Sequence, residues 1–206
     1  MTNHELLVAQ GREIVQNAPQ AYIDLDVEAD GKAGYGSLLS IGGVSPWGDE
    51  FYAELKPTSD KYIPSQREFC ENHGLQRERL LVEGEEPRKA LRDLARWTIG
   101  ITKSHNKQSP VLTAFNASFD YPWIDLAMLR VGMPKNPFGT AGYCIKSLAL
   151  ALKDTYDWRE TSKGNLPAEL VPEGDFTHNA LEDSRYQQQI HFALVGKLAS
   201  RVLKLN

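Results

Sequence analysis

Three groups of acidic and polar side chains in this sequence have the types and spacing needed to bind metal ions or transfer protons. The first consists of Asp24, Asp26 and Glu28, which alternate with isoleucine, leucine and valine over residues 21–28. In an extended strand these carboxylates share one face, with Cα atoms about 7 Å apart from one acid to the next. Burying each unpaired carboxylate costs several kcal/mol. The pattern therefore predicts a bound divalent cation, unless the strand is an exposed edge or Lys and Arg elsewhere neutralise it.

The second group lies between Asn116 and Asp120, where a short apolar strand over residues 110–115 meets a helix over residues 117–131. This position aims side chains into a cleft at the carboxyl edge of a sheet. A purely structural role also fits, because asparagine is a common N-cap residue and an aspartate in the first turn complements the helix dipole.

The third group runs from His178 to Asp183. Asn179 and Glu182 have the spacing of a capping box, which predicts that a helix begins at Ala180. The residue before the N-cap and the fourth helical residue meet across a helix start, so the spacing predicts an imidazole beside a carboxylate. A lone histidine in this place can also be a surface or capping residue. The remaining histidines have no such context, and we expect them to be structural or solvent-exposed: His4, His73, His105 and His191.

Helical and strand-like periodicities alternate along the chain and define the elements that must position these groups. Three strands followed by helices alternating with strands indicate an α/β protein, with a mixed central sheet and helices on both faces. Residues 154–177 lack periodicity, and so long a segment is usually a functional or mobile loop. We expect helices over residues 4–17, 64–72, 87–103, 117–131, 145–152 and 180–203, and strands over residues 21–28, 37–44, 50–55 and 110–115.

Composition is that of an ordinary soluble protein, with 41% hydrophobic and 24% charged residues in a chain of 206. We expect a single domain over residues 1–206, with residues 1–19 as an N-terminal helical extension. No apolar run is long enough for a membrane span, and Cys70 and Cys144 lack pairing or metal-ligand spacing, so we expect a cytoplasmic location. A formal charge of −4 allows nucleic acid as a partner but favours a small footprint.

The same three groups carry a resemblance to a known family. YIDLDVEADG (residues 22–31) resembles a motif of a hydrophobic strand followed by D-x-E-x-x-G, and LTAFNASFDYPWI (residues 112–124) resembles a strand followed by N-x-x-F-D. HNALEDSR (residues 178–185) is similar to H-x-A-x-x-D at a helix start. In this order, the motifs resemble those of the DEDDh family of 3′–5′ exonucleases. The chain departs from the family at Phe115, where histidine is frequent, at Ala29-Asp30, where Thr-Thr is common, and at the additional acid Asp24.

The resemblance implies a ribonuclease H-like fold, a five-stranded mixed sheet flanked by helices. It implies catalysis by His178, which activates water, together with Glu28, and the use of two divalent cations. Hard oxygen ligands suit Mg²⁺ or Mn²⁺, and two ions about 3.5–4 Å apart stabilise both the nucleophile and the leaving group. The implied metal ligands are Asp26, Glu28, Asp120 and Asp183.

The activity implied is hydrolysis from the 3′ end of single-stranded DNA or RNA, releasing nucleoside 5′-monophosphates. The alternative is a non-catalytic module, derived from an exonuclease, that binds nucleic acid or a polymerase. Arg159 and Lys163 could contact phosphate, although solvated loop charges are the simpler interpretation. The sequence leaves open DNA or RNA as substrate, and homodimerisation. Candidate substrate-binding residues are Tyr35, Asn116, Phe119 and Trp123, of which we favour Tyr35 for base stacking, since Phe119 is expected to pack in the core.

Overall fold

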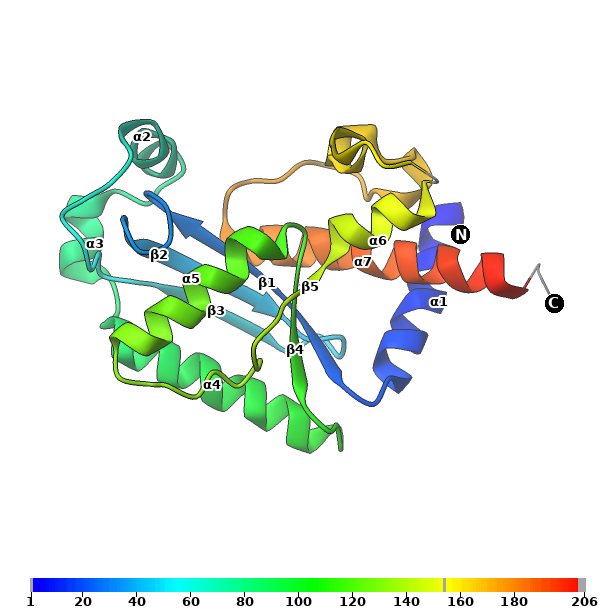
Figure 1. The fold of residues 1–206 in the computed structure, drawn as a ribbon, viewed down its shortest axis with the longest axis horizontal. Helices are drawn as coiled ribbons and strands as arrows, with labels where there is room; N and C mark the ends of the chain where they lie inside the picture. Colours follow the sequence, from blue (N-terminus) through cyan, green and yellow to red (C-terminus); the bar gives the residue numbers. More distant parts are fainter. Residues whose placement is uncertain (1, 154, 204–206) are drawn as a thin grey trace.

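A five-stranded sheet with the order β3-β2-β1-β4-β5 forms the centre of the protein (Figure 1). The computed structural model describes residues 2–153 and 155–203. β1 pairs antiparallel with β2 and parallel with β4, so the sheet is mixed, as the sequence predicted. The strands are β1 (Ala21–Ala29), β2 (Leu38–Val44), β3 (Glu50–Glu54), β4 (Pro110–Ala114) and β5 (Tyr143–Cys144).

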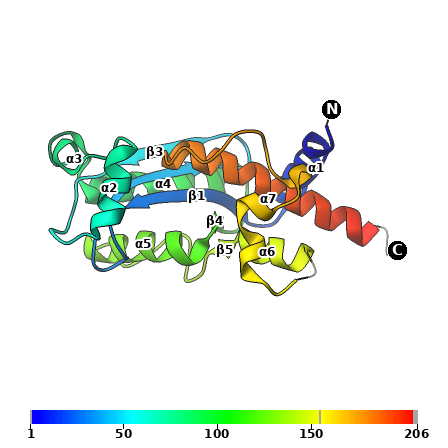
Figure 2. The ribbon, with the colours of Figure 1, turned by 90° about the horizontal axis from the view of Figure 1, so that it is seen from above.

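Helices cover both faces of this sheet, and Figure 2 shows α5 and α7 on opposite sides of β1. Among the described residues, none of the helices combines the length and apolar composition needed to cross a bilayer. The helices are α1 (Asn3–Asn17), α2 (Pro64–Asn72), α3 (Arg77–Glu83), α4 (Pro87–Ser104), α5 (Ala117–Arg130), α6 (Ile145–Leu152) and α7 (Ala180–Leu203), with short 3₁₀ turns η1 (Trp158–Thr161), η2 (Lys163–Asn165) and η3 (Ala168–Leu170).

The two faces of β1 are buried in different ways. Ile23, Leu25 and Val27 are buried in an apolar core with leucines of α4 and with Ile124 and Met128 of α5. The opposite face carries the acidic residues and is covered by α7, whose side chains there are polar. Period-two alternation in β1 thus separates a core that stabilises the fold from a polar layer that can hold a site.

The predicted helices and strands are confirmed, with their ends displaced by at most a few residues. Two elements, α3 and β5, were not predicted from the sequence. α3 is seven residues long and has no side-chain capping bond, and β5 is only two residues long, so neither shows enough periodicity to be recognised. The aperiodic segment 154–177 contains the three 3₁₀ turns.

Gly42 of β2 lets the start of α7 lie directly on the sheet. A Cβ at this position would be 2.1 Å from the carbonyl carbon and oxygen of Ala180, the first residue of α7. Because both groups belong to main chains, neither can move aside as a side chain would. The close approach of the α7 N-terminus to the sheet therefore requires glycine at position 42.

Gly42→Ala is expected to lower the free energy of unfolding by about 1–3 kcal/mol, because it forces α7 away from the sheet. The matched control is Gly100→Ala in α4, where nothing lies within 4 Å of the added Cβ. That change is expected to raise stability by about 0.5–1 kcal/mol, because alanine favours helix. Urea denaturation measures both; a Gly42→Ala protein as stable as the wild type would contradict the packing argument.

Candidate active site

The site opens where the parallel strands β1 and β4 separate. Their pairing ends at Asp24 and Thr113. Beyond this point the buried amide of Gln187, from α7, bridges the strands: its Nε2 donates to Leu25 O at 2.7 Å, and its Oε1 accepts from Phe115 N at 2.7 Å. Gln187 thereby satisfies two backbone groups that the sheet leaves unpaired, so the strand ends can separate without losing hydrogen bonds.

Asp120, in the first turn of α5, is tied to β1. It is 4% exposed, and its Oδ1 accepts a hydrogen bond from Val27 N at 3.3 Å, between Asp26 and Glu28. Asn116 is the N-cap residue of α5, but its side chain makes no capping bond and instead accepts from Ser118 Oγ. Capping therefore does not account for this motif.

Asp183 organises the chain that leads into α7. Its Oδ1 accepts from Thr177 N at 2.7 Å and its Oδ2 from His178 N at 3.0 Å. His178 has a φ of 59°, in the left-handed region that non-glycine residues rarely adopt. Asn179 caps the helix by accepting from Leu181 N and Glu182 N. The predicted helix start at Ala180 is confirmed; however, Asn179 N donates to Thr177 Oγ1 rather than closing the reciprocal half of a capping box.

The predicted placement of the His178 imidazole beside the Asp183 carboxylate is also confirmed, and Glu28 joins them. Ligand atoms of Glu28, His178 and Asp183 lie within 4.8 Å of one another, and His178 Nδ1 is 3.9 Å from Glu28 Oε1. The ring of His178 also packs against Phe69 of α2 and against His73, the residue that follows α2, with ring centroids 4.4 Å and 4.6 Å away. His73 had no assigned role, and nothing local in the sequence shows that it lies beside His178.

Four carboxylates share this end of the sheet, and their burial raises the pKa of each one. Burial, and then the charges of Asp120, Glu28 and Asp183, raise the pKa of Asp26 well above its usual range. Burial, Asp183 and Asp120 raise the pKa of Glu28 to about 8, and burial raises that of Asp120 to about 7. Burial also raises the pKa of Asp183. Within the described ranges, no lysine or arginine forms an ion pair with these four groups.

The pKa of His178 moves in the opposite direction. Burial lowers it, and the nearby His73 and Lys163 lower it further, although the charge of Asp183 opposes the shift. The side chain is still 37% exposed. The imidazole is therefore biased towards its neutral form, which can accept a proton from water that reaches the site.

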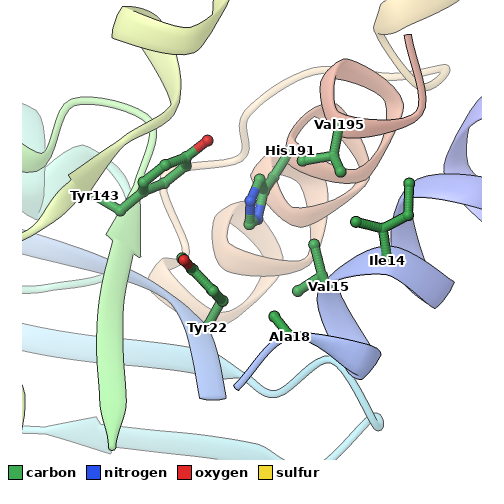
Figure 3. A pocket seen from close by; sticks show the side chains of 7 residues that line it. All are labelled: Ile14, Val15, Ala18, Tyr22, Tyr143, His191 and Val195. Carbon is green, nitrogen blue, oxygen red and sulfur yellow. The ribbon is translucent and has the colours of Figure 1, made fainter. Parts of the chain in front are cut away.

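Asp24 is separate from this cluster. It is fully buried, with His191 Nδ1 3.4 Å and Gln188 Nε2 3.3 Å from its Oδ2. Asp24, the acid that the family motif does not include, thus pairs with a basic side chain. That partner, His191, was expected to be structural or exposed, and it is buried. Figure 3 shows His191 with Tyr22 and Tyr143 around a cavity of about 150 Å³, whose other lining residues are apolar. None of the four clustered carboxylates lines that cavity.

The proposed substrate-binding residues divide into exposed and buried ones. Tyr35 is 48% exposed, Phe119 is 37% exposed, and Asn116 is exposed. The expectation that Phe119 packs in the core is therefore wrong. Trp123 is only 2% exposed and belongs to the apolar core, because it follows Asp120 by three residues on the inward side of α5. It has no free face for stacking on a base.

The two loop cations considered for phosphate binding are both neutralised within the loop. Arg159 pairs with Asp157 at 2.7 Å, and Lys163 with Asp175 at 2.6 Å. Their charges are therefore already compensated, which agrees with the simpler interpretation as loop charges.

Comparison with solved structures shows which class of fold this arrangement of helices and strands belongs to. The nuclease domain of 3′hExo, described as a DEDDh family member bound to rAMP, matches with a TM-score of 0.64 and 11% identity over 85% of this chain and 92% of that chain. The S. pombe protein Pop2p, in a Mg²⁺- and Mn²⁺-bound form, matches with a TM-score of 0.60 and 14% identity over 92% and 88%. The fold is thus that of the ribonuclease H-like exonucleases.

Sequence similarity then gives the family. No family model matches the chain. The 3′–5′ DNA exonuclease Cap18 of Escherichia coli is 33% identical over 185 residues, which cover 88% of this chain and 95% of that protein. The chain belongs to the DEDDh family of 3′–5′ exonucleases, and its class of enzyme is that of metal-dependent phosphodiester hydrolases. The resemblance noted in the sequence is confirmed.

The raised carboxyl pKa values predict how pH affects the metal-free protein. Glu28 and Asp120 hold protons in the folded state up to pKa values of about 8 and about 7, whereas the unfolded chain releases them at about pH 4. Their stabilising contribution is therefore present in acid and lost as pH rises through these folded-state values. We expect Tm in EDTA to fall between about pH 5 and about pH 9, and added Mg²⁺ to raise Tm more at higher pH.

Glu28→Gln is the control for this prediction, because it removes one of the titrating groups. Differential scanning fluorimetry with and without Mg²⁺ should show a smaller fall of Tm with pH in this variant. The assignment of these raised pKa values would be contradicted if Tm fell equally with pH in the wild type and in Glu28→Gln. It would also be contradicted if Mg²⁺ raised Tm by the same amount at every pH.

Proposed function

We propose that this exonuclease shortens single-stranded DNA from its 3′ end by a two-metal-ion mechanism and releases nucleoside 5′-monophosphates. The observation that supports the mechanism is the meeting of four carboxylates, without a lysine or arginine partner among the described residues, beside one histidine that favours its neutral form. DNA is proposed because Cap18, which is similar over most of the chain, is by name a DNA exonuclease.

The proposed metal ligands are Asp26, Glu28, Asp120 and Asp183. All four donate hard carboxylate oxygens, which suits Mg²⁺ or Mn²⁺. Cys70 is not part of this cluster: its Sγ donates to Ala29 O, and burial raises the pKa of its thiol to about 12. When bound, divalent cations would supply positive charge for the attacking water and for the departing 3′ oxygen.

His178 is proposed as the general base. Its backbone is held by Asp183, and its ring lies between Glu28 and the side chains of Phe69 and His73. A neutral imidazole in this position can take the proton of the attacking water. Glu28, whose carboxylate faces Nδ1, would help to orient the ring in addition to binding metal.

The terminal nucleotides are proposed to contact exposed side chains around the carboxylate cluster. Tyr35, in the loop after β1, presents an open ring with Lys61 Nζ 5.7 Å from its centroid. Phe119, directly before Asp120, and Asn116, one turn before it, are exposed at the start of α5. Aromatic rings beside a cation suit the bases and phosphates of an unpaired strand.

His178→Ala and Asp183→Asn are expected to fail in different ways. Loss of the general base should lower kcat about 10²–10⁴-fold while leaving the Mg²⁺-induced rise in Tm intact. Asp183→Asn, which removes the charge of a proposed metal ligand, should abolish both activity and the Mg²⁺-induced rise in Tm. The assay follows 5′-labelled single-stranded DNA and RNA with Mg²⁺, Mn²⁺ or EDTA, in parallel with thermal denaturation.

The matched control is His105→Ala, which removes a histidine at the far end of α4, where it stacks on Trp47. It should shorten DNA at the wild-type rate. Intact DNA and RNA with the wild-type protein under every metal condition would overturn the proposed function. A fully active His178→Ala protein would overturn the role of the histidine.

A further inference from the structure

We propose that a surface between α5 and α6, centred on Lys146 and Trp158, binds the nucleotides upstream of the scissile bond. This inference rests on the proposed function, because it assigns a second part of the same substrate to a named surface. It predicts an enzyme that distinguishes longer single strands from very short ones.

A row of contacting side chains runs from Phe176, close to His178 in the sequence, to this surface. Phe176 lies two residues before His178, and its ring contacts that of Phe115 with centroids 5.9 Å apart. Lys146 Nζ lies 6.0 Å from the centroid of Phe115 on one side and 4.8 Å from that of Trp158 on the other. The backbone of Lys146 is also fixed, since its N–H donates to Phe115 O.

Lys146 is a cation without a carboxylate partner within the described ranges of the chain. The neighbouring cations of α6 and the following loop all have one, in the pairs Lys153–Glu160, Arg159–Asp157 and Lys163–Asp175. Aromatic faces hold the Lys146 ammonium in place, but they do not neutralise it. A phosphate of the substrate backbone would supply the missing negative charge.

Beside Lys146 the surface is hollowed by about 350 Å³. The hollow begins at the first turn of α5, the turn that also carries Asp120, and ends at Trp158, which is 44% exposed. Its lining includes Ala117, Ser118, Tyr121, Pro122, Ser147 and Trp158.

This combination favours a single nucleic-acid strand as the occupant. An exposed indole provides a stacking face for a base, and an adjacent unpaired ammonium provides a phosphate contact. The hollow shares the start of α5 with the catalytic carboxylates, so a strand whose 3′ end is bound there can continue into it. Under this proposal a strand of two or three nucleotides makes fewer of these contacts than a longer one.

The test compares a 5′-labelled trinucleotide with a dodecamer of the same 3′ sequence. Trp158→Ala should raise KM for the dodecamer about tenfold and leave kcat and the trinucleotide parameters near wild type. Trp158→Phe should retain most of the dodecamer affinity, because it keeps an aromatic face. Lys146→Gln should also raise KM for the dodecamer, and should reduce the slope of log(kcat/KM) against log[salt] by about 0.7.

The control is Lys103→Gln, an exposed lysine at the end of α4, which should change neither substrate. Wild-type trinucleotide activity in the Trp158 variants shows that their active sites are folded; if Trp158→Ala does not fold, Lys146→Gln still decides the question. Equal changes for both substrates, or no change in either, would overturn this inference while leaving the exonuclease intact. Absence of 3′ shortening of any substrate by the wild type would instead overturn the proposed function.

Discussion

The burial of four carboxylates close together is the constraint on which the site depends. Folding brings these groups together because β1 must bury its apolar face against α4 and α5, which leaves its acidic face towards α7. No lysine or arginine of the described residues pairs with them. Burial, Asp183 and Asp120 raise the pKa of Glu28 to about 8, and burial raises that of Asp120 to about 7. The arrangement that makes proton release unfavourable is the one that favours a divalent cation.

α7 links this cluster to the rest of the molecule. Its first turn carries Asp183, which also holds the backbone of His178. One turn later, Gln187 joins the diverging ends of β1 and β4, and further along the helix His191 accompanies the buried Asp24. The helix α7 thus contacts the acidic face of β1 at two places: the buried pair of Asp24 and His191, and the cluster of Glu28 and Asp183 beside His178. Because it has no side chain, Gly42 allows the first residue of α7 to lie in contact with the sheet.

Charge is distributed unevenly around the carboxylate cluster, and this distribution bears on the proposed substrate binding. The long segment before α7 neutralises its own cations with its own acids, whereas Lys146 remains between Phe115 and Trp158 without a counter-charge in the described structure. A protein with a formal charge of −4 can therefore still offer a local positive site. A small footprint near the 3′ end agrees with this pattern better than a broad basic face would.

Local patterns in the sequence determined the strand that carries Asp26 and Glu28, the helix start beside Asp183 and the order of the main elements, because periodicity and capping depend on near neighbours. They also determined the family, through three motifs. Tertiary structure alone decided that Asp24 pairs with His191, that Trp123 is buried and Phe119 exposed, and that His73 lies beside His178. These facts depend on which faces of separate helices and strands pack together. Contacts between residues more than a hundred positions apart, such as His73 and His178, produce no local sequence pattern from which they could be predicted.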